Sequence, residues 1–388
     1  MILILERELR SFTGHHHTQI AAIRRLVPDQ KVCVITTQSF KINLHVTDYQ
    51  VLPILPAKQW QIHAEIASSL SLRKSPCHEV AQLLHGAMSK LRMGPNDRLV
   101  IPSCRSDYLR SLLVLYTGPG VQSLPPARVR ILSTDVLKSL SKVERDHLRK
   151  LISKQHICLY TETQELAEQF KFAYNLPCSD QFLLPVTIPL NTTLIDPTPP
   201  ENAIYRIACL GQQRRGKGSF DIPDILTKLR HAAALKLPGT QIKIQVQAAA
   251  KSNWRNRHFL RSVQRSEDLN PNVTIELLPS ELSPAAFIEH LKAAHVVLLP
   301  YWVSRYGKRG SGMVTDGVLA RKPIVHTRGL SMSKYLNSGN AIAAAGPEQF
   351  ANALIAVAKD WHQFRKGAED AAKLLEEQIQ KARNSIMG

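Results

Sequence analysis

Short apolar runs alternate with amphipathic segments along almost the whole chain, and this alternation constrains the fold more than any other feature of the sequence. The runs are rich in Val, Ile and Leu, which is typical of strands in a parallel sheet that helices cover on both faces. In the first half of the chain we predict strands at 2–6, 32–36, 51–55, 98–103, 129–133 and 157–160. In the second half we predict them at 203–210, 241–246, 273–278, 296–300, 323–326 and 341–345.

A polar stretch with three prolines, residues 191–201, interrupts this alternation. Because proline removes a backbone donor and keeps its predecessor extended, the stretch predicts a linker. We therefore predict an α/β protein of two doubly wound, Rossmann-like domains: residues 1–195, a linker at 196–202, residues 203–360, and a helix at 361–388 that packs back toward the first domain. Ligands of such sheets bind beyond the carboxyl ends of the strands, so the domains are expected to face each other across a cleft.

The chain is strongly basic, because 50 basic and 31 acidic residues give a net charge of +19. Such a balance favours anionic partners: nucleic acid, phosphorylated small molecules or acidic lipid surfaces. Aromatic residues make up only 6% of the chain, and no RNP, zinc-finger or basic-helix motif occurs, so we expect no nucleic-acid partner. Much of the excess lies in two stretches, 206–230 and 305–334, which each follow a predicted strand and lead into a helix. A phosphate is commonly bound at that position.

The cysteines and the longest apolar run exclude several other classes. The six cysteines form no C-x-x-C pair, which argues against a zinc ribbon or a redox motif, and we expect no metal. The run at 296–303 is too short to cross a membrane. The first residues carry no basic leader, so we expect a reducing, cytoplasmic location.

The first basic stretch contains a glycine-rich turn, residues 210–218, between a predicted strand and a helix. Gly211 permits a backbone conformation that other residues resist, and Arg214 and Lys217 can reach one anion from neighbouring turns. The turn departs from the Walker pattern because Gly218 stands where a hydroxyl must bind magnesium. A phosphate loop and a merely solvated basic turn both remain open at this point.

The second basic stretch contains a Gly-Ser-Gly turn that opens a helix. Tyr301 closes a strand, Arg309 follows, and Gly310, Ser311 and Gly312 precede the predicted helix at 313–320. Free amides at a helix N-terminus can bind a diphosphate, and Ser311 suits the N-cap. Asp316, about one turn inside, would accept hydrogen bonds from ribose hydroxyls or simply pair with the helix dipole.

Together the two turns resemble the C-terminal domain of retaining GT-B glycosyltransferases of the glycosyltransferase family 4 type. The resemblance is clearest over residues 203–345 and extends weakly to the glycine loop at 11–16. It implies a hexosyl- or related transferase that moves a sugar from a nucleotide-diphosphate sugar to a glycan or lipid-linked acceptor, with retention and in cell-envelope polysaccharide biosynthesis. The donor would bind mainly to the second domain and the acceptor to the first, without a metal or other cofactor.

The resemblance also assigns individual residues. Lys217 matches the family's phosphate-binding lysine, Arg214 its arginine partner, and Asp316 the second acid of an E-x7-E motif that holds the ribose. The residues expected to bind the donor are Gly14, Gly211, Pro279, Ser280, Tyr301, Arg309, Gly310, Ser311, Gly312 and Asp316. The residues expected to act in catalysis are Lys217, Arg214, Lys308 and His16.

Three positions depart from the family pattern. Many members place the arginine directly after the glycine, where this chain has Gln212. Lys308 replaces the first acid of the E-x7-E motif, so the donor sugar is itself anionic, or Lys308 neutralises the leaving diphosphate, or catalysis is impaired. No histidine follows the fourth strand, and His15, His16 or His17 would have to supply an imidazole there. Adjacent histidines that begin a helix are also common as surface or cap residues.

Several alternatives stay open. The predicted helix at 135–150 surrounds an apolar stripe with basic residues, which fits either an anionic membrane surface, and then a peripheral place at the inner face of the plasma membrane, or an ordinary solvated face. A sugar-nucleotide epimerase or a catalytically silent GT-B relative would keep the fold without the transfer reaction. A nucleic-acid-binding protein is the third alternative, because of the net charge alone.

Overall fold

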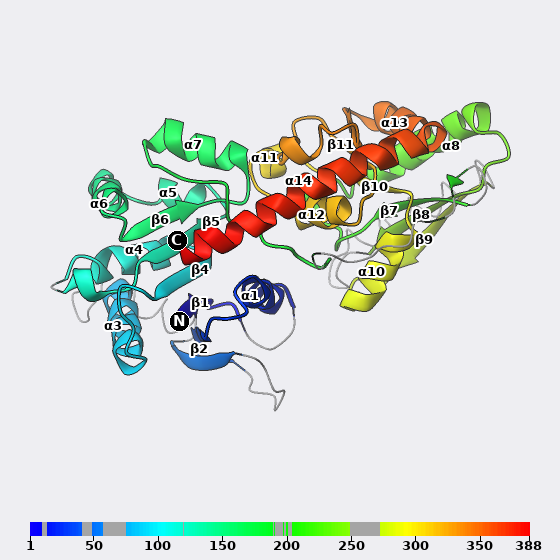
Figure 1. The fold of residues 1–388 in the computed structure, drawn as a ribbon. Helices are drawn as coiled ribbons and strands as arrows, with labels where there is room; N and C mark the ends of the chain where they lie inside the picture. The colour runs from blue at the N-terminus through cyan, green and yellow to red at the C-terminus, as the bar shows by residue number, and fades with distance from the viewer. Residues whose placement is uncertain are drawn as a thin grey trace. The chain divides into compact units, whose positions relative to one another are not determined.

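The computed structural model divides the chain into two compact units (Figure 1). Unit 1 comprises Met1–Leu184 and Gln378–Gly388, and unit 2 comprises Pro185–Glu377. The structure describes residues 1–9, 14–40, 49–56, 75–118, 120–188, 190, 197, 199–200, 204–248 and 272–388.

Each unit is built on a six-stranded sheet in which every neighbouring pair of strands is parallel. The strands of unit 1 are β1 (Ile2–Leu5), β2 (Val32–Thr37), β3 (Gln50–Leu55), β4 (Arg98–Cys104), β5 (Ala127–Ile131) and β6 (Ile157–Tyr160), in the order β3-β2-β1-β4-β5-β6. Those of unit 2 are β7 (Tyr205–Cys209), β8 (Ile242–Gln247), β9 (Val273–Leu278), β10 (Val296–Leu299), β11 (Ile324–Thr327) and β12 (Ala341–Ala344), in the order β12-β11-β10-β7-β8-β9. The two predicted doubly wound α/β domains are confirmed, and the cleft predicted between them stays a prediction.

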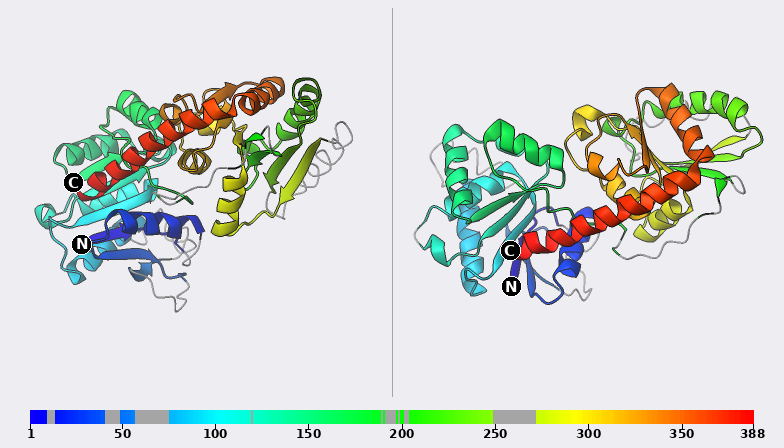
Figure 2. Two further views of the ribbon diagram at one scale, coloured as in Figure 1. Left: turned by 45° about the vertical axis from the view of Figure 1, so that its right-hand side comes forward. Right: turned by 45° about the horizontal axis from the view of Figure 1, so that its top comes forward.

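Helices lie on both sides of each sheet (Figures 1 and 2). Unit 1 carries α1 (Gly14–Leu26), α3 (Pro76–Lys90), α4 (Ser106–Leu115), α5 (Asp135–Lys138), α6 (Lys142–Ser153) and α7 (Gln164–Tyr174). Unit 2 carries α8 (Ile222–Lys236), α10 (Pro284–Ala293), α11 (Val303–Tyr306), α12 (Gly312–Leu319) and α13 (Pro347–Lys359). The last helix, α14 (Trp361–Met387), begins in unit 2 and ends in unit 1. No described helix is long and apolar enough to cross a membrane.

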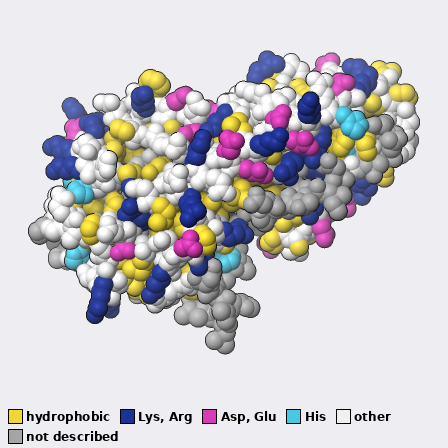
Figure 3. Space-filling model, viewed as in Figure 1, with side chains coloured by type: hydrophobic (Ala, Val, Ile, Leu, Met, Phe, Trp, Pro, Cys, Tyr) yellow, Lys and Arg dark blue, Asp and Glu magenta, His cyan; other side chains and the backbone are white. Residues whose placement is uncertain are grey.

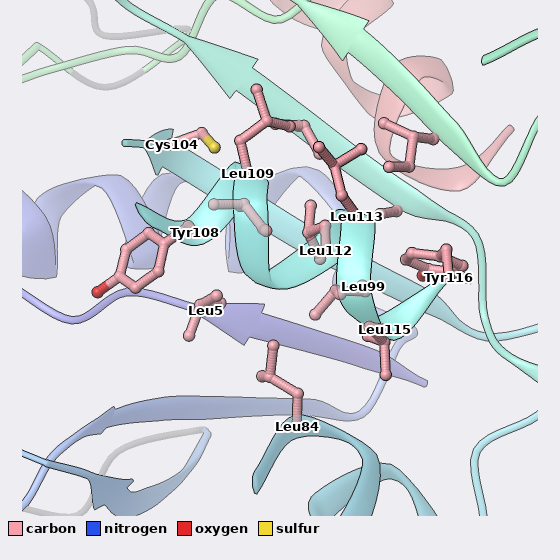
Figure 4. Packing of buried hydrophobic residues seen from close by; sticks show 14 of the residues in the cluster. Leu5, Leu84, Leu99, Cys104, Tyr108, Leu109, Leu112, Leu113, Leu115 and Tyr116 are labelled. Atoms are coloured by element: carbon pink, nitrogen blue, oxygen red, sulfur yellow. The ribbon is translucent and has the colours of Figure 1, made fainter. Parts of the chain in front are cut away.

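The strands form the centre of each core because their side chains are apolar on both faces. In unit 1, Leu5 of β1 and Leu99 of β4 lie between helices, with Leu112 of α4 and Leu84 of α3 packed close to them (Figure 4). In unit 2 the described core joins the strands to α8 and α13. Inner strands such as β1 and β2 are buried along their whole length, which explains why their sequences are so apolar.

The prediction of one continuous helix at 135–150 is wrong, because the structure has two helices there. The chain leaves the helical path after α5 and starts again at α6, because Ser141 and Glu144 form a capping box. The Glu144 backbone N–H donates to the Ser141 hydroxyl at 3.2 Å, and the Ser141 backbone N–H donates to the Glu144 carboxylate at 2.7 Å. A capping box begins a helix at a fixed residue, so the apolar spacing across 135–150 was not one helical face.

The boundary between the units lies at Leu184 and Pro185, earlier than the predicted end of the first domain at residue 195. Thr187 and Ile188 belong to unit 2 because their backbone N–H groups donate to the Asp316 carboxylate, at 2.8 and 3.0 Å. Most of the predicted linker at 196–202 lies outside the described residues.

The terminal helix, α14, is divided between the two units. Trp361 is buried in unit 2, where its Nε1 donates to the carbonyl of His295 at 3.1 Å. The last part of α14 belongs to unit 1, where Gln378 donates to the carbonyl of Asp180 and Ser385 to that of Gln181. The helix predicted at 361–388 therefore packs in unit 1 only over residues 378–388.

Candidate functional site

The turn after β7 is held in shape by two glycines. Gly211 and Gly218 have φ values of +83° and +71°, in the left-handed region that side chains disfavour. Between them, residues 215–217 form one turn of 3-10 helix, and the Lys217 backbone N–H donates to the Arg214 carbonyl at 2.7 Å. A Cβ at position 218 would collide with the carbonyl group of Pro300, at the end of β10. The glycine therefore lets this turn lie directly against the neighbouring strand end.

Lys217 is a cation held partly out of water in this turn. Its Nζ lies so close to Gly211 that a Cβ there would collide with it, and it stands 5.7 Å from the centre of the Tyr301 ring. Burial, and secondarily the charge of Arg214, lower the pKa of Lys217 to about 8. A partly desolvated ammonium interacts strongly with an anion that reaches it, so Lys217 is suited to bind a phosphate group.

Arg214 is fixed by a tyrosine that the sequence did not identify. Its Nη2 donates to the Tyr306 hydroxyl at 3.0 Å, and the Tyr306 ring lies 4.7 Å from the Tyr301 ring, centre to centre. Both aromatic residues are buried. The two predicted cations of this turn, Arg214 and Lys217, thus rest against one pair of tyrosines that follows β10.

The segment after β10 also contacts the turn that carries Lys217. The Trp302 backbone N–H donates to the Gly216 carbonyl at 3.1 Å, and the Arg215 guanidinium lies 4.9 Å from the centre of the indole ring. The Arg305 side chain packs against Gly216, since its Cδ would be 2.7 Å from a Cβ there. Arg215 and Arg305 therefore add positive charge around the turn that carries Lys217.

The N-terminus of α12 reaches the turn as well. The Met313 side chain, in the first turn of α12, would be 3.4 Å from a Cβ at Gly211, the residue that also adjoins Lys217. The first turn of α12 and the Lys217 turn therefore both adjoin Gly211 within unit 2. That they bind one diphosphate stays a prediction.

The predicted cap at Ser311 is only partly right. Ser311 is the N-cap residue of α12, but its side chain makes no capping hydrogen bond, and its backbone N–H donates to the Met332 sulfur at 3.3 Å. Gly310 and Ser311 are both buried. Gly312 begins the helix and lies against Val186, which would be 3.3 Å from a Cβ at position 312.

Asp316 lies inside α12 with only 2% of its side chain exposed. Its Oδ1 accepts hydrogen bonds from the Thr187 and Ile188 backbone N–H groups. Burial outweighs these bonds and raises the pKa of Asp316 to about 6. The carboxylate therefore has a structural partner within unit 2, and its contact with a ribose stays a prediction.

Gln247, which no sequence motif marked, joins two predicted parts of the site. Its Oε1 accepts from the Gly211 backbone N–H at 2.7 Å, and its Nε2 donates to the Ser280 carbonyl at 3.0 Å. The amide thereby ties the glycine turn after β7 to the loop after β9, where Pro279 is exposed. A single glutamine at a strand end carries no sequence signal, because its role depends on which loops the sheet brings together.

Two further predicted site residues of the second stretch are Lys308 and Arg309. Lys308 is exposed, and Arg309 is half-buried with its carbonyl accepting from the Ser331 hydroxyl at 2.6 Å. Whether either side chain contacts a donor stays a prediction.

The predicted residues of unit 1 lie after β1. Gly14 is the first residue of α1, and residues 11–13 of the predicted glycine loop lie outside the described residues. The His16 Nδ1 stands 3.2 Å from the carboxylate of Glu6, which is buried at the end of β1. This contact fixes one ring nitrogen of His16, and its catalytic role stays a prediction. Over the described ranges, no three His, Cys, Asp or Glu residues gather in a way that could hold a metal ion.

Solved structures with the same architecture span nearly the whole chain. No protein-family model and no curated protein sequence matches it. An α,α-trehalose-phosphate synthase (UDP-forming) from Burkholderia xenovorans, in complex with glucose-6-phosphate, matches with a TM-score of 0.63 and 10% identity, over 100% of this chain and 98% of that one. Sucrose-phosphate synthase from Thermosynechococcus elongatus matches with a TM-score of 0.58 and 10% identity, over 98% and 94%. A glycosyltransferase from Rickettsia africae ESF-5 matches with a TM-score of 0.56 and 12% identity, over 100% and 94%.

The fold is GT-B. The two parallel six-stranded sheets of this chain, with their flanking helices, match the two Rossmann-like domains of that fold. Identities of 10–12% establish the architecture and leave the reaction to be argued from the site.

Proposed function

We propose that this protein is a glycosyltransferase that moves a hexosyl or related group from a nucleotide-diphosphate sugar to a glycan or lipid-linked acceptor. The convergence of Lys217 and the α12 N-terminus at Gly211 carries the proposal, because it offers a cation and a helix end to one diphosphate. The GT-B fold supports it, and so does the Escherichia coli trehalose-6-phosphate enzyme, a structural neighbour with bound UDP-2-fluoro glucose.

The proposed mechanism rests on stabilising a leaving group. Breaking the bond between sugar and phosphate places negative charge on the departing diphosphate, while the sugar carbon becomes oxocarbenium-like. Lys217 and Arg214 would neutralise that charge, and burial strengthens the effect of Lys217. The proposal includes no metal, because positive side chains supply the compensating charge. It follows the family resemblance in expecting retention at the anomeric carbon.

The proposal is tested by binding and turnover with a panel of nucleoside diphosphates and their sugars. A bound donor raises the melting temperature by mass action, so a thermal-shift panel identifies the base and the sugar. Lys217→Ala is expected to abolish transfer and to weaken diphosphate binding while the fold persists. Lys228→Ala is the matched control, because Lys228 is an exposed lysine on α8 away from the turn. Unchanged turnover in Lys217→Ala would contradict the proposal.

The acceptor is open between two chemical classes. The Burkholderia xenovorans neighbour is a complex with glucose-6-phosphate, so a sugar phosphate is the first soluble acceptor to test. A glycan or lipid-linked acceptor in cell-envelope polysaccharide biosynthesis is the second class. The product formed with each, and its anomeric configuration by NMR, separates these acceptors and checks the expected retention.

An anionic membrane surface as a partner finds support on α6 and α7. Lys and Arg side chains gather at the edge of unit 1 where α6 lies (Figure 3). Val143 of α6 and Phe172 of α7 are 78% and 81% exposed, and Lys142 and Lys150 are exposed as well. Basic and apolar side chains presented together suit a peripheral place at the inner face of the plasma membrane.

The Arg145 and Arg149 side chains differ from Lys142 and Lys150, because they contact residues at the end of α7. Arg149 donates to the carbonyls of Tyr174 and Asn175, and Arg145 lies 5.9 Å from the centre of the Tyr174 ring. Flotation with phosphatidylglycerol vesicles tests the surface, and Phe172→Asp should release the protein. Absence of the wild-type protein from the vesicle fraction would contradict it.

Lys308 keeps a second function under consideration. Because a lysine stands where the resembled family has the first acid of its E-x7-E motif, an epimerase or a silent GT-B relative would fit the same fold. Incubation with donor alone discriminates between them: an epimerase isomerises the sugar, a transferase at most hydrolyses it slowly, and a silent relative binds it unchanged.

A further inference from the structure

A cavity of about 370 Å³ opens in unit 2 beside the segment that follows β10. Its walls come from the start of α8, residues 300–304, the end of β11 and the start of α13. The volume falls within the roughly 300–1,000 Å³ of known small-molecule sites. Apart from Tyr301, its lining residues are not among those predicted to bind the donor.

The lining combines aromatic surface with hydroxyl and carboxylate groups. Trp302 and Phe350 provide the aromatic surface, and Asp221, Ser304 and Thr327 provide the polar groups. The Asp221 carboxylate accepts from the Trp302 Nε1 at 3.2 Å, which holds both side chains in place. A preorganised wall of this kind suits a ligand with one apolar face and several hydroxyl groups.

The start of α13 closes the cavity on another side. Gly346, which lines the cavity, is the N-cap residue of α13, and Pro347 follows it. Pro347 has no backbone N–H, and the Phe350 N–H donates to the Gly346 carbonyl at 3.2 Å, so this wall offers mainly apolar surface.

The charges around the cavity select against ionic ligands of either sign. The Asp221 carboxylate disfavours an anion inside the cavity. The Arg215 guanidinium lies 4.9 Å from the Trp302 ring centre, so the indole already interacts with a cation and a second cation would be repelled. A neutral ligand remains the best match.

We infer that this cavity is a second carbohydrate-binding site, which takes a neutral saccharide unit on Trp302 and Asp221. The saccharide's apolar C–H face would lie on the aromatic surface, and its hydroxyl groups would donate to the carboxylate. The cavity shares only Tyr301 with the residues predicted to bind the donor. The inference does not depend on the transferase proposal, since it needs only binding.

The test is isothermal titration of the full chain with maltose as the neutral probe. We expect measurable binding that persists in saturating UDP. Asp221→Asn keeps the shape of the side chain but loses the charged acceptor, so maltose should bind about tenfold more weakly, as expected for a hydrogen bond to a charged group. Ser304→Trp, at an exposed position, should fill the cavity and abolish binding.

Asp224→Asn is the matched control, because Asp224 is an exposed acid in the first turn of α8 that does not line the cavity. It should bind maltose as the wild type does. The inference is overturned if maltose does not bind, if UDP displaces it, or if Ser304→Trp binds it normally. Because Ser304 lies at the surface, that variant remains informative even if Asp221→Asn fails to fold.

Discussion

Lys217 lowers the stability of the folded state but is suited to bind an anion. Burial lowers its pKa from 10.5 to about 8, so the folded protein holds its proton less tightly than the unfolded chain does. Its contribution to stability therefore rises with pH between about 8 and 10.5, where the unfolded state binds more protons. An anion at the site would reverse this penalty, which is the usual pattern for a functional cation.

Replacing Lys217 with methionine should raise the stability of unit 2 while it weakens diphosphate binding. The apolar side chain fills similar space beside Tyr301 without a charge to desolvate. We expect the melting temperature at pH 7 to rise by roughly 2–4 °C, the shift that about 1 kcal/mol produces in a domain of this size. Calorimetry with and without UDP checks both parts. A lower melting temperature would show that the charged form is stabilised by the fold.

The affinity of the site for a nucleoside diphosphate should depend on pH. Lys217 is fully charged well below pH 8 and loses its proton above it. We expect affinity for UDP to be constant at lower pH and to fall by up to about tenfold per unit above pH 8. Lys217→Arg should remove this decline, because arginine stays protonated throughout. The same fall in the arginine variant would assign the titration to another group.

Gly218 should tolerate no side chain. Its φ is positive, and a Cβ there would meet the Pro300 carbonyl, which is backbone and cannot move aside. We expect Gly218→Ala to destabilise unit 2 by more than about 2 kcal/mol. Gly239→Ala is the control, since Gly239 has a φ of +79° but nothing within 4 Å of its Cβ position. Equal losses in both variants, measured by urea unfolding, would mean that the contact with β10 is unimportant.

At the level of single residues, spacing alone predicted the cations but not their partners. Arg214 and Lys217 stand out because basic residues in a glycine turn after a strand have a local signature. Tyr306 and Gln247 have none, because they act on parts of the chain that are distant in sequence. Asp316 was predicted to face a ligand. Its backbone partner Thr187 is far from it in the sequence, so local sequence patterns could not predict this contact.

Helix α12 ties the start of unit 2 to its interior, through the contact of Asp316 with Thr187 and Ile188. The carboxylate accepts from two backbone N–H groups that would otherwise need other partners. This contact explains why the start of unit 2 precedes the proline-rich stretch.

Removing the Asp316 acceptor should destabilise unit 2. Asp316→Leu leaves two backbone N–H groups unsatisfied, which costs about 2–5 kcal/mol. Asp316→Asn keeps Oδ1 as an acceptor and should stay within about 1 kcal/mol of the wild type. Because the pKa of Asp316 is raised from 3.8 to about 6, the folded state binds more protons in that window, and this group's contribution to stability falls as pH rises through it. Urea unfolding at several pH values should show that decline in the wild type but not in Asp316→Asn.

The sequence predicts the positions of the strands more accurately than the position where a helix is interrupted. All the predicted strand runs match strands within a few residues, because parallel strands buried on both faces leave a continuous apolar signal. The break between α5 and α6 was missed because the apolar spacing continues across it, and the capping box of Ser141 and Glu144 decides where α6 begins.

At the scale of the whole molecule, α14 places both ends of the chain in unit 1. Its last part is buried there through Ile379 and Ile386, and the Met387 carbonyl accepts from the Arg98 Nε at 2.8 Å. The division of α14 was not predictable, since one helix runs without interruption from Trp361 to Met387, across residues 377 and 378.

Deleting residues 378–388 should destabilise unit 1 selectively. The loss of two buried isoleucines costs about 4 kcal/mol or more, which corresponds to a melting transition roughly 8–16 °C lower. Differential scanning calorimetry should show this shift in one transition while that of unit 2 stays in place. Lys381→Ala, at an exposed position of the same segment, is the control. Equal shifts in both transitions would show that the units unfold together.

The split of unit 1 between the two ends of the chain also restricts how such proteins can recombine. A crossover near residue 184 that joins the first half of one gene to the second half of another would pair an N-terminal sheet with a foreign final helix segment. The isoleucines of that final segment would then pack against a unit 1 core from the other parent, to which their shape is not matched. Functional chimeras should therefore arise from double exchanges, in which residues 1–184 and 378–388 are inherited together from one parent.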